Sequence, residues 1–159
     1  MEVKAYAKVN LFLNVKGERE DGFHDLEMVN ITVGLADILR IESNKTGEIT
    51  CKTSIPELNG KNNLAYKVAV HLKKLFRIQD GVDIFIEKHI PVGGGLGGGS
   101  ADAAACLEGL NELWKLGLDF DEMYELAKNF GSDTPYCLYK APAIVRGIGF
   151  DLEPIDVDI

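Results

Sequence analysis

The chain lacks the features that mark secreted and membrane proteins. It has three cysteines, Cys51, Cys106 and Cys137, an odd number at wide spacing that fits neither a disulfide framework nor a zinc site and is typical of a reducing compartment. No apolar run approaches ~18 residues, and no apolar segment of a signal peptide opens the sequence. We therefore expect a soluble, cytoplasmic protein; a plastid location would apply only in a plant, and no transit peptide is present.

Positive charge is also scarce. The sequence has 17 Lys and Arg against 25 Asp and Glu, a net charge of −8. This excess of acid argues against binding the phosphate backbone of nucleic acids, so we expect neither a nucleic-acid nor a membrane partner. A protein of this charge that binds phosphate has to concentrate its cations locally. The 159 residues, 46% of them hydrophobic, suit one globular domain.

Strand patterns come first and helix patterns later, which predicts an α+β fold. Val9, Leu11, Leu13 and Val15 alternate with more polar positions and predict a strand with one buried face. Residues 26–33 and 37–42 predict two strands joined by a tight turn at Gly34. Further strands are expected over 48–52, 82–88 and 143–146. Helices are expected from Asn62 or Asn63 to Leu75 and over 101–116. A third helix is expected after Asp119, where Glu122 completes a capping box.

Glycine, in contrast, is concentrated in one place. Residues 93–99 contain six glycines, within the run Pro91-Val92-Gly93-Gly94-Gly95-Leu96-Gly97-Gly98-Gly99-Ser100. The run lies between a predicted strand and a predicted helix, where bare backbone N–H groups and the helix dipole attract anions. A flexible linker is the alternative, but linkers usually lie at domain edges. The run therefore predicts a phosphate-binding loop, with Ser100 as a phosphate or Mg²⁺ ligand or, equally, as an ordinary helix N-cap.

Three known glycine motifs do not explain this loop. Gly93, Gly95 and Gly98 match the spacing of the dinucleotide fingerprint, but residues 112–121 predict the end of a helix and a loop where that motif needs a strand ending in an acid. No Gly-Lys-Ser/Thr closes the loop, which excludes a Walker A motif. The sequence also lacks the His-Arg-Asp and Asp-Phe-Gly motifs of protein kinases.

Four polar or aromatic residues outside the loop have two interpretations each. Lys8, in an apolar strand, is either an edge residue whose ammonium reaches water or a deliberately placed charge. Asp133 either forms a helix cap or an Asx-turn, or is a functional carboxylate. Phe23 and His24 follow Asp21-Gly22 in a predicted turn and are either core and surface residues or a binding platform.

Taken in order, the motifs resemble those of the GHMP kinase superfamily. The matching segments are Ala7–Leu13, Asp21–Leu26, Asn63-Leu64, Glu87–Pro91, Gly93–Ala104, Gly131–Pro135 and Arg146–Gly149. The resemblance implies a mixed sheet packed with helices, related to the second domain of ribosomal protein S5. The Asp21–His24 turn points to the branch that phosphorylates the 2-hydroxyl of a cytidine-diphosphate methylerythritol in non-mevalonate isoprenoid synthesis.

The resemblance also implies residue roles. Asp133 would be the catalytic base and Lys8 its charged neighbour, which stabilises developing negative charge. Asn10, Phe23 and His24 would hold the substrate. ATP with Mg²⁺ would be bound by Asn63, Lys88, Pro91, Gly93, Gly94, Gly95, Leu96, Gly97, Gly98, Gly99 and Ser100, with Ser100 also the candidate metal ligand.

The sequence departs from the family pattern in three ways. Phe23 stands where Tyr is common, and Ala101 stands where a second serine often follows Ser100. Family members continue into a C-terminal lobe of comparable size, whereas this sequence, residues 1–159, covers an N-terminal, ATP-binding lobe alone. We therefore expect a fragment of a longer kinase, with little or no activity by itself. The oligomeric state stays open.

Three alternatives remain. One is another kinase of the superfamily, acting on homoserine or a mevalonate-type acceptor, against which the Asp21–His24 turn argues. The second is a non-catalytic nucleotide-binding half-protein. The third is an RNA-binding domain, which the net charge of −8 disfavours.

Overall fold

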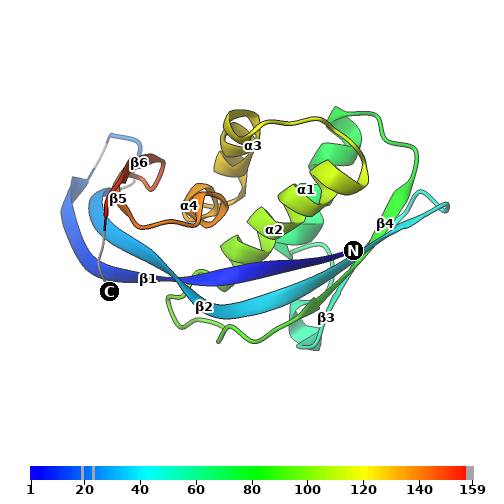
Figure 1. Ribbon diagram of the computed structural model, residues 1–159, viewed down its shortest axis with the longest axis horizontal. Coiled ribbons are helices and arrows are strands. Elements are labelled where there is room, and N and C mark those ends of the chain that lie inside the picture. The colour runs from blue at the N-terminus through cyan, green and yellow to red at the C-terminus, as the bar shows by residue number, and fades with distance from the viewer. Residues whose placement is uncertain (19, 23, 157–159) are drawn as a thin grey trace.

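A mixed sheet carries a layer of helices on one face (Figure 1) in the computed structural model, which describes residues 1–18, 20–22 and 24–156. The strands are β1 (Glu2–Glu18), β2 (His24–Asn44), β3 (Ile49–Thr53), β4 (Gly81–Glu87), β5 (Ala143–Gly147) and β6 (Asp151–Pro154). The helices are α1 (Leu64–Leu75), α2 (Gly98–Leu113), α3 (Phe120–Ala127) and α4 (Thr134–Tyr139), with 3₁₀ turns η1 (Pro56–Leu58) and η2 (Lys128–Phe130).

The strand order is β3-β4-β2-β5-β6, and β1 pairs along β2. Strands β3 and β4 are parallel and the other pairs are antiparallel. The predicted α+β class and mixed sheet are therefore confirmed. No helix in the described part of the chain is long and apolar enough to cross a membrane.

Two helices begin where local sequence predicts. The Asn63 side chain accepts the Ala65 N–H at 2.9 Å and caps α1. Asp119 and Glu122 form the reciprocal capping box that starts α3. Both predictions are confirmed, because an N-cap satisfies backbone donors only two or three residues away and needs no distant partner.

The predicted turn at Gly34 is wrong, since β2 runs unbroken from His24 to Asn44. The glycine instead lies where the register against β1 shifts: Tyr6 pairs with Ala36, but Lys8 pairs with Thr32. A glycine inside a strand pattern often marks such an irregularity, which twists the strand and redirects its side chains. The shift immediately precedes Lys8 and so helps to set its orientation.

The predicted buried face of the first strand is also wrong beyond Asn10. Leu11, Leu13 and Val15 are 55%, 53% and 54% exposed. In this half, β1 pairs with β2, β2 with β5 and β5 with β6, and this end of the sheet curves away from helices α1 and α2 (Figure 1). Alternation of apolar residues predicts a strand but cannot tell whether another layer covers it.

Helix α2 lies against the sheet because its packed face is built from small residues. The buried residues of its first half include Ala101, Ala103, Ala104 and Ala105. At Gly109 an added Cβ would lie 2.6 Å from Ile41 Cδ1 on β2, so this position has no space for a side chain. Small residues thus bring the N-terminus of α2, and the glycine loop before it, close to β1 and β2.

We expect Gly81→Ala to destabilise the fold strongly. A Cβ at residue 81 would lie 2.1 Å from the Glu48 carbonyl oxygen, so backbone must move, and we expect a loss of about 3 kcal/mol in the free energy of unfolding. Gly34→Ala is the control, because nothing lies within 4 Å of its Cβ; it should be neutral or stabilising by up to ~1 kcal/mol. Urea unfolding measures both, and equal losses would contradict the packing.

The three cysteines should be unreactive in the folded protein. All are free and buried. Burial raises the pKa of Cys51 to about 11 and that of Cys137 to about 12, and it raises the pKa of Cys106 as well. Because the thiolate is the reactive form, an aromatic disulfide reagent at pH 8 should react slowly with native protein and rapidly with all three thiols after denaturation. Rapid native labelling would show that the core opens.

Candidate active site

The glycine loop joins β4 to α2 and ends inside the helix. Helix α2 begins at Gly98, three residues before the predicted start, and its N-cap is Gly97. Ser100 therefore lies in the first turn, and its interpretation as the N-cap is wrong. The loop and the first turn together present the unpaired N–H groups of a helix N-terminus, where anions bind.

The loop backbone requires glycine at specific positions. Gly93, Gly95 and Gly97 have φ of 77°, 73° and 70°, a left-handed conformation that other residues adopt at a cost. At Gly97 an added Cβ would also lie 3.0 Å from Lys8 Cγ. The bare backbone at the start of a helix fits a polyphosphate, because no side chain stands between the N–H groups and the ligand.

A pocket of ≈ 430 Å³ lies against this loop. Residues 91–99 line one part of it, and Glu57–Asn59 and Asn62–Leu64 line another, together with Lys88 and Asp102. Every residue expected to contact nucleotide lines the pocket except Ser100. Sequence reasoning missed Glu57–Asn59, which belong to or follow the short turn η1 and carry no recognisable motif.

On the sheet side of the loop, Lys8 and Asp133 come together from distant segments. Lys8 Nζ lies 3.6 Å from Asp133 Oδ2 and donates to Asn10 Oδ1 at 3.2 Å. Lys8 is 4% exposed, so its interpretation as an edge residue is wrong. Its backbone N–H donates to the Leu96 carbonyl at 2.9 Å, which ties β1 directly to the glycine loop.

Asp133 occupies the N-cap position of α4, but its side chain makes no capping hydrogen bond. The carboxylate instead faces Lys8 and is one-third exposed. The helix-cap interpretation is therefore wrong for this side chain. Gly131, two residues earlier, lies close to Ser100, since a Cβ on Gly131 would be 3.5 Å from Ser100 Oγ. The carboxylate, the ammonium and the end of the loop thus share one region.

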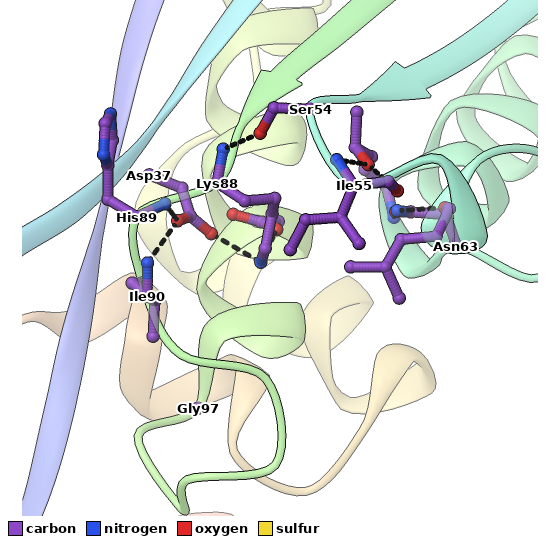
Figure 2. Close-up of polar contacts among 12 residues, drawn as sticks. Asp37, Ser54, Ile55, Asn63, Lys88, His89, Ile90 and Gly97 are labelled. Carbon is purple, nitrogen blue, oxygen red and sulfur yellow. Dashed lines mark hydrogen bonds and ion pairs between the residues drawn. The ribbon is translucent and has the colours of Figure 1, made fainter.

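Lys88 lies at the other side of the loop, between two carboxylates. Its ammonium is 2.6 Å from Asp37 Oδ2 and 2.8 Å from Asp102 Oδ2, and all three side chains are nearly inaccessible. Figure 2 shows the Lys88 side chain pointing to Asp37. Sequence reasoning missed Asp37, although the alternation Asp37, Leu39, Ile41 places this acid on a buried face of β2.

The charges of this cluster affect one another. Burial raises the pKa of Asp102 to about 8, with help from Asp37 and against the pull of Lys88. Burial acts on Asp37 in the same direction, but hydrogen bonds from Asp102, the Ile90 N–H and Lys88 outweigh it and lower the pKa of Asp37. Burial lowers the pKa of Lys88, but the two carboxylates raise it more, so Lys88 stays charged.

The remaining expected site residues have different outcomes. Asn63 lines the pocket, but its side chain is engaged as the α1 cap and donates to the Leu58 carbonyl. Phe23 and the side chain of His24 lie outside the described residues. No group of three or more His, Cys, Asp and Glu side chains in the described ranges is placed to hold a metal ion.

Comparisons with known proteins match this chain to one family. The model of the GHMP kinases N terminal domain matches residues 63–141. A 4-diphosphocytidyl-2-C-methyl-D-erythritol kinase of Exiguobacterium sibiricum is 48% identical over 96% of this chain and 54% of its own length. The enzyme of that name from Clostridioides difficile is 46% identical over 98% of this chain and 53% of its own length.

A solved structure agrees. A crystal structure of 4-(cytidine 5'-diphospho)-2C-methyl-D-erythritol kinase superposes with a TM-score of 0.84 and 39% identity, over 99% of this chain and 56% of that one. The chain thus spans about half the length of the relatives it matches. With its loop, its site and these similarities, the chain belongs to the GHMP kinases and contains their N-terminal domain.

Proposed function

We propose that the protein to which this chain belongs transfers a phosphoryl group from ATP to a hydroxyl of 4-diphosphocytidyl-2-C-methyl-D-erythritol. The single observation that supports this best is the Lys8–Asp133 pair, 3.6 Å apart beside the glycine loop. A carboxylate and an ammonium next to a polyphosphate cradle suit phosphoryl transfer to an alcohol, because that reaction needs positioning, charge stabilisation and removal of one proton. The acceptor is taken from the names of the relatives.

In this proposal Asp133 accepts the proton of the acceptor hydroxyl. Its partial exposure leaves the carboxylate accessible, and the absence of a capping bond leaves it available. Lys8 holds the carboxylate in place and lies close enough to stabilise negative charge that develops on the transferring group. Asn10, which accepts a hydrogen bond from Lys8, keeps the ammonium oriented and is the nearest candidate to contact the acceptor.

The glycine loop binds the nucleotide phosphates through backbone N–H groups, and the pocket beyond it has room for the rest of a nucleotide. ATP, when bound, supplies the phosphoryl group, and Mg²⁺ neutralises part of its charge. The Ser100 hydroxyl lies close to Gly131, and the described residues hold no cluster of three or more His, Cys, Asp and Glu side chains placed for a metal, which fits an ion held mainly by phosphate oxygens. A cytoplasmic location stays a prediction.

Asp133→Asn should abolish most turnover without weakening nucleotide binding. The loss of a general base costs about 10²–10⁴ in kcat, and Lys8→Met should act in the same direction. Neither residue lines the pocket, so the Kd of Mg·ATP should change less than about threefold. The mass of the protein purified from its natural source is determined first. ATP consumption with the cytidyl acceptor is then measured on that protein, or on recombinant protein of the same length.

Asp80→Asn and Lys45→Met are the matched controls, because these residues form an exposed ion pair outside the site. Their turnover should equal that of the unmodified protein. An Asp133→Asn enzyme with normal kcat would overturn the assignment of the base.

Gly97→Ala should weaken nucleotide binding specifically. Gly97 has φ of 70° and touches Lys8, whereas Gly117 has φ of 72° with nothing within 4 Å of its Cβ. Both substitutions cost about 1–2 kcal/mol of backbone strain. Only Gly97→Ala also displaces the loop, and we expect its Kd for Mg·ATP to rise about tenfold by calorimetry. An equal rise in Gly117→Ala would mean that strain alone is responsible.

Competition by CDP tests the acceptor. If the acceptor carries a cytidyl group, CDP should inhibit turnover competitively with it. Phosphorylation of homoserine or mevalonate, without inhibition by CDP, would replace this acceptor by another of the superfamily and leave the kinase assignment in place.

A further inference from the structure

The glycine loop has few side chains with which to hold its own shape, and one buried cluster contacts the segments at both of its ends. At the entrance, β4 ends at Glu87 and the chain continues through Lys88, His89 and Ile90. At the exit, Asp102 lies in the second turn of α2. The Lys88 ammonium links the two, since it bonds to Asp102 at 2.8 Å and to Asp37 at 2.6 Å.

Asp37 makes most of the contacts at the entrance. Its Oδ1 accepts the backbone N–H groups of His89 at 2.7 Å and Ile90 at 2.8 Å, while its Oδ2 accepts from Lys88 (Figure 2). The residue is fully buried on β2. One carboxylate thus fixes the direction in which the chain leaves the sheet and enters the loop.

Stabilisation of the fold does not by itself explain why Asp37, Lys88 and Asp102 are buried together. Two acidic side chains share one ammonium at a place nearly closed to water, and one oxygen of Asp102, Oδ1, is buried without a hydrogen-bond partner. Burying charge costs free energy that an apolar cluster of the same volume would not, so a buried ion pair is weak evidence for stabilisation. Its directional bonds do, however, specify geometry, and the geometry they specify is that of the loop.

We propose that Asp37 is a positioning residue for nucleotide binding, which acts through Lys88 and the backbone of residues 89–90 to fix both ends of the glycine loop. The proposal rests on the proposed function in so far as the loop binds phosphate. Asp37 itself does not line the pocket. In this view Lys88 contributes to the site mainly by joining the loop ends, because its ammonium is bonded to both Asp37 and Asp102.

Two substitutions separate the contacts. Asp37→Asn keeps an oxygen for the two backbone N–H groups but turns an NH₂ donor toward the Lys88 ammonium, which releases Lys88. Asp102→Asn keeps an acceptor for Lys88 and leaves a one-to-one pair with Asp37, so it should fold and keep the loop ends joined. Asp83→Asn is the control, because Asp83 is an exposed acid on β4 that accepts hydrogen bonds from Asn44 and Thr50, outside the cluster.

The first readout is hydrogen exchange of the chain without nucleotide. Asp37→Asn should accelerate exchange in peptides that cover residues 88–102 and leave peptides from α3 unchanged. The second is the Kd of Mg·ATP, measured well below the melting temperature of each variant. Asp37→Asn should raise it about tenfold, at the lower end of what is lost when a group that orients binding residues is removed. Asp102→Asn, which keeps an acceptor for Lys88, should raise it less than Asp37→Asn does, and Asp83→Asn should not differ from the unmodified protein.

A failure of the Asp37 inference can be distinguished from a failure of the proposed function. Unchanged exchange at residues 88–102 in Asp37→Asn would overturn the inference, and so would an unchanged Kd. A lower melting temperature with uniformly faster exchange and normal Kd would mean that Asp37 is only structural. If the full-length protein without substitutions binds no nucleotide, the proposed function fails, and local exchange still decides whether Asp37 holds the loop. Should Asp37→Asn not fold, Lys88→Met with Asp102→Asn breaks the same link while Asp37 keeps its two backbone bonds.

Discussion

The close approach of helix α2 to the sheet is the constraint on which the site depends. The helix begins immediately after the glycine loop, and its small buried residues, together with Gly109, let it lie directly on the side chains of β1 and β2. Large side chains at these positions would lift the helix and carry the loop away from Lys8. Interiors packed to crystal-like density transmit such a displacement rather than absorb it.

Given that approach, three contacts set the loop in place. Its middle is held by the Leu96 carbonyl, which accepts the Lys8 N–H, its entrance by Asp37, and its exit by the bond from Lys88 to Asp102. The loop can therefore consist almost entirely of glycine without being a flexible linker. Glycine supplies left-handed backbone and close approach, while the rest of the domain supplies the order that glycine lacks.

Positive charge is distributed unevenly in this acidic protein. The protein has a net charge of −8, yet the two lysines nearest the loop, Lys8 and Lys88, are both buried and both paired with carboxylates. An acidic surface with two interior cations keeps positive charge away from nonspecific anions and places it beside one site. In surroundings of low dielectric constant each of these charges also acts more strongly than it would in water.

The sequence by itself determined the features that depend on near neighbours: the α+β class, the starts of α1 and α3, and a glycine loop between a strand and a helix. Caps and glycine conformations act over two to four residues, so a single segment contains the whole signal. The family resemblance already made Lys8 the neighbour of Asp133, and the structure gives that pair its distance of 3.6 Å. Only the tertiary structure decided that Asp37 meets Lys88, that β2 continues through Gly34, and that Leu11, Leu13 and Val15 of β1 stay exposed. These depend on strand register and on which elements cover which face, and a one-residue slip in register would turn each such side chain to the opposite side of the sheet.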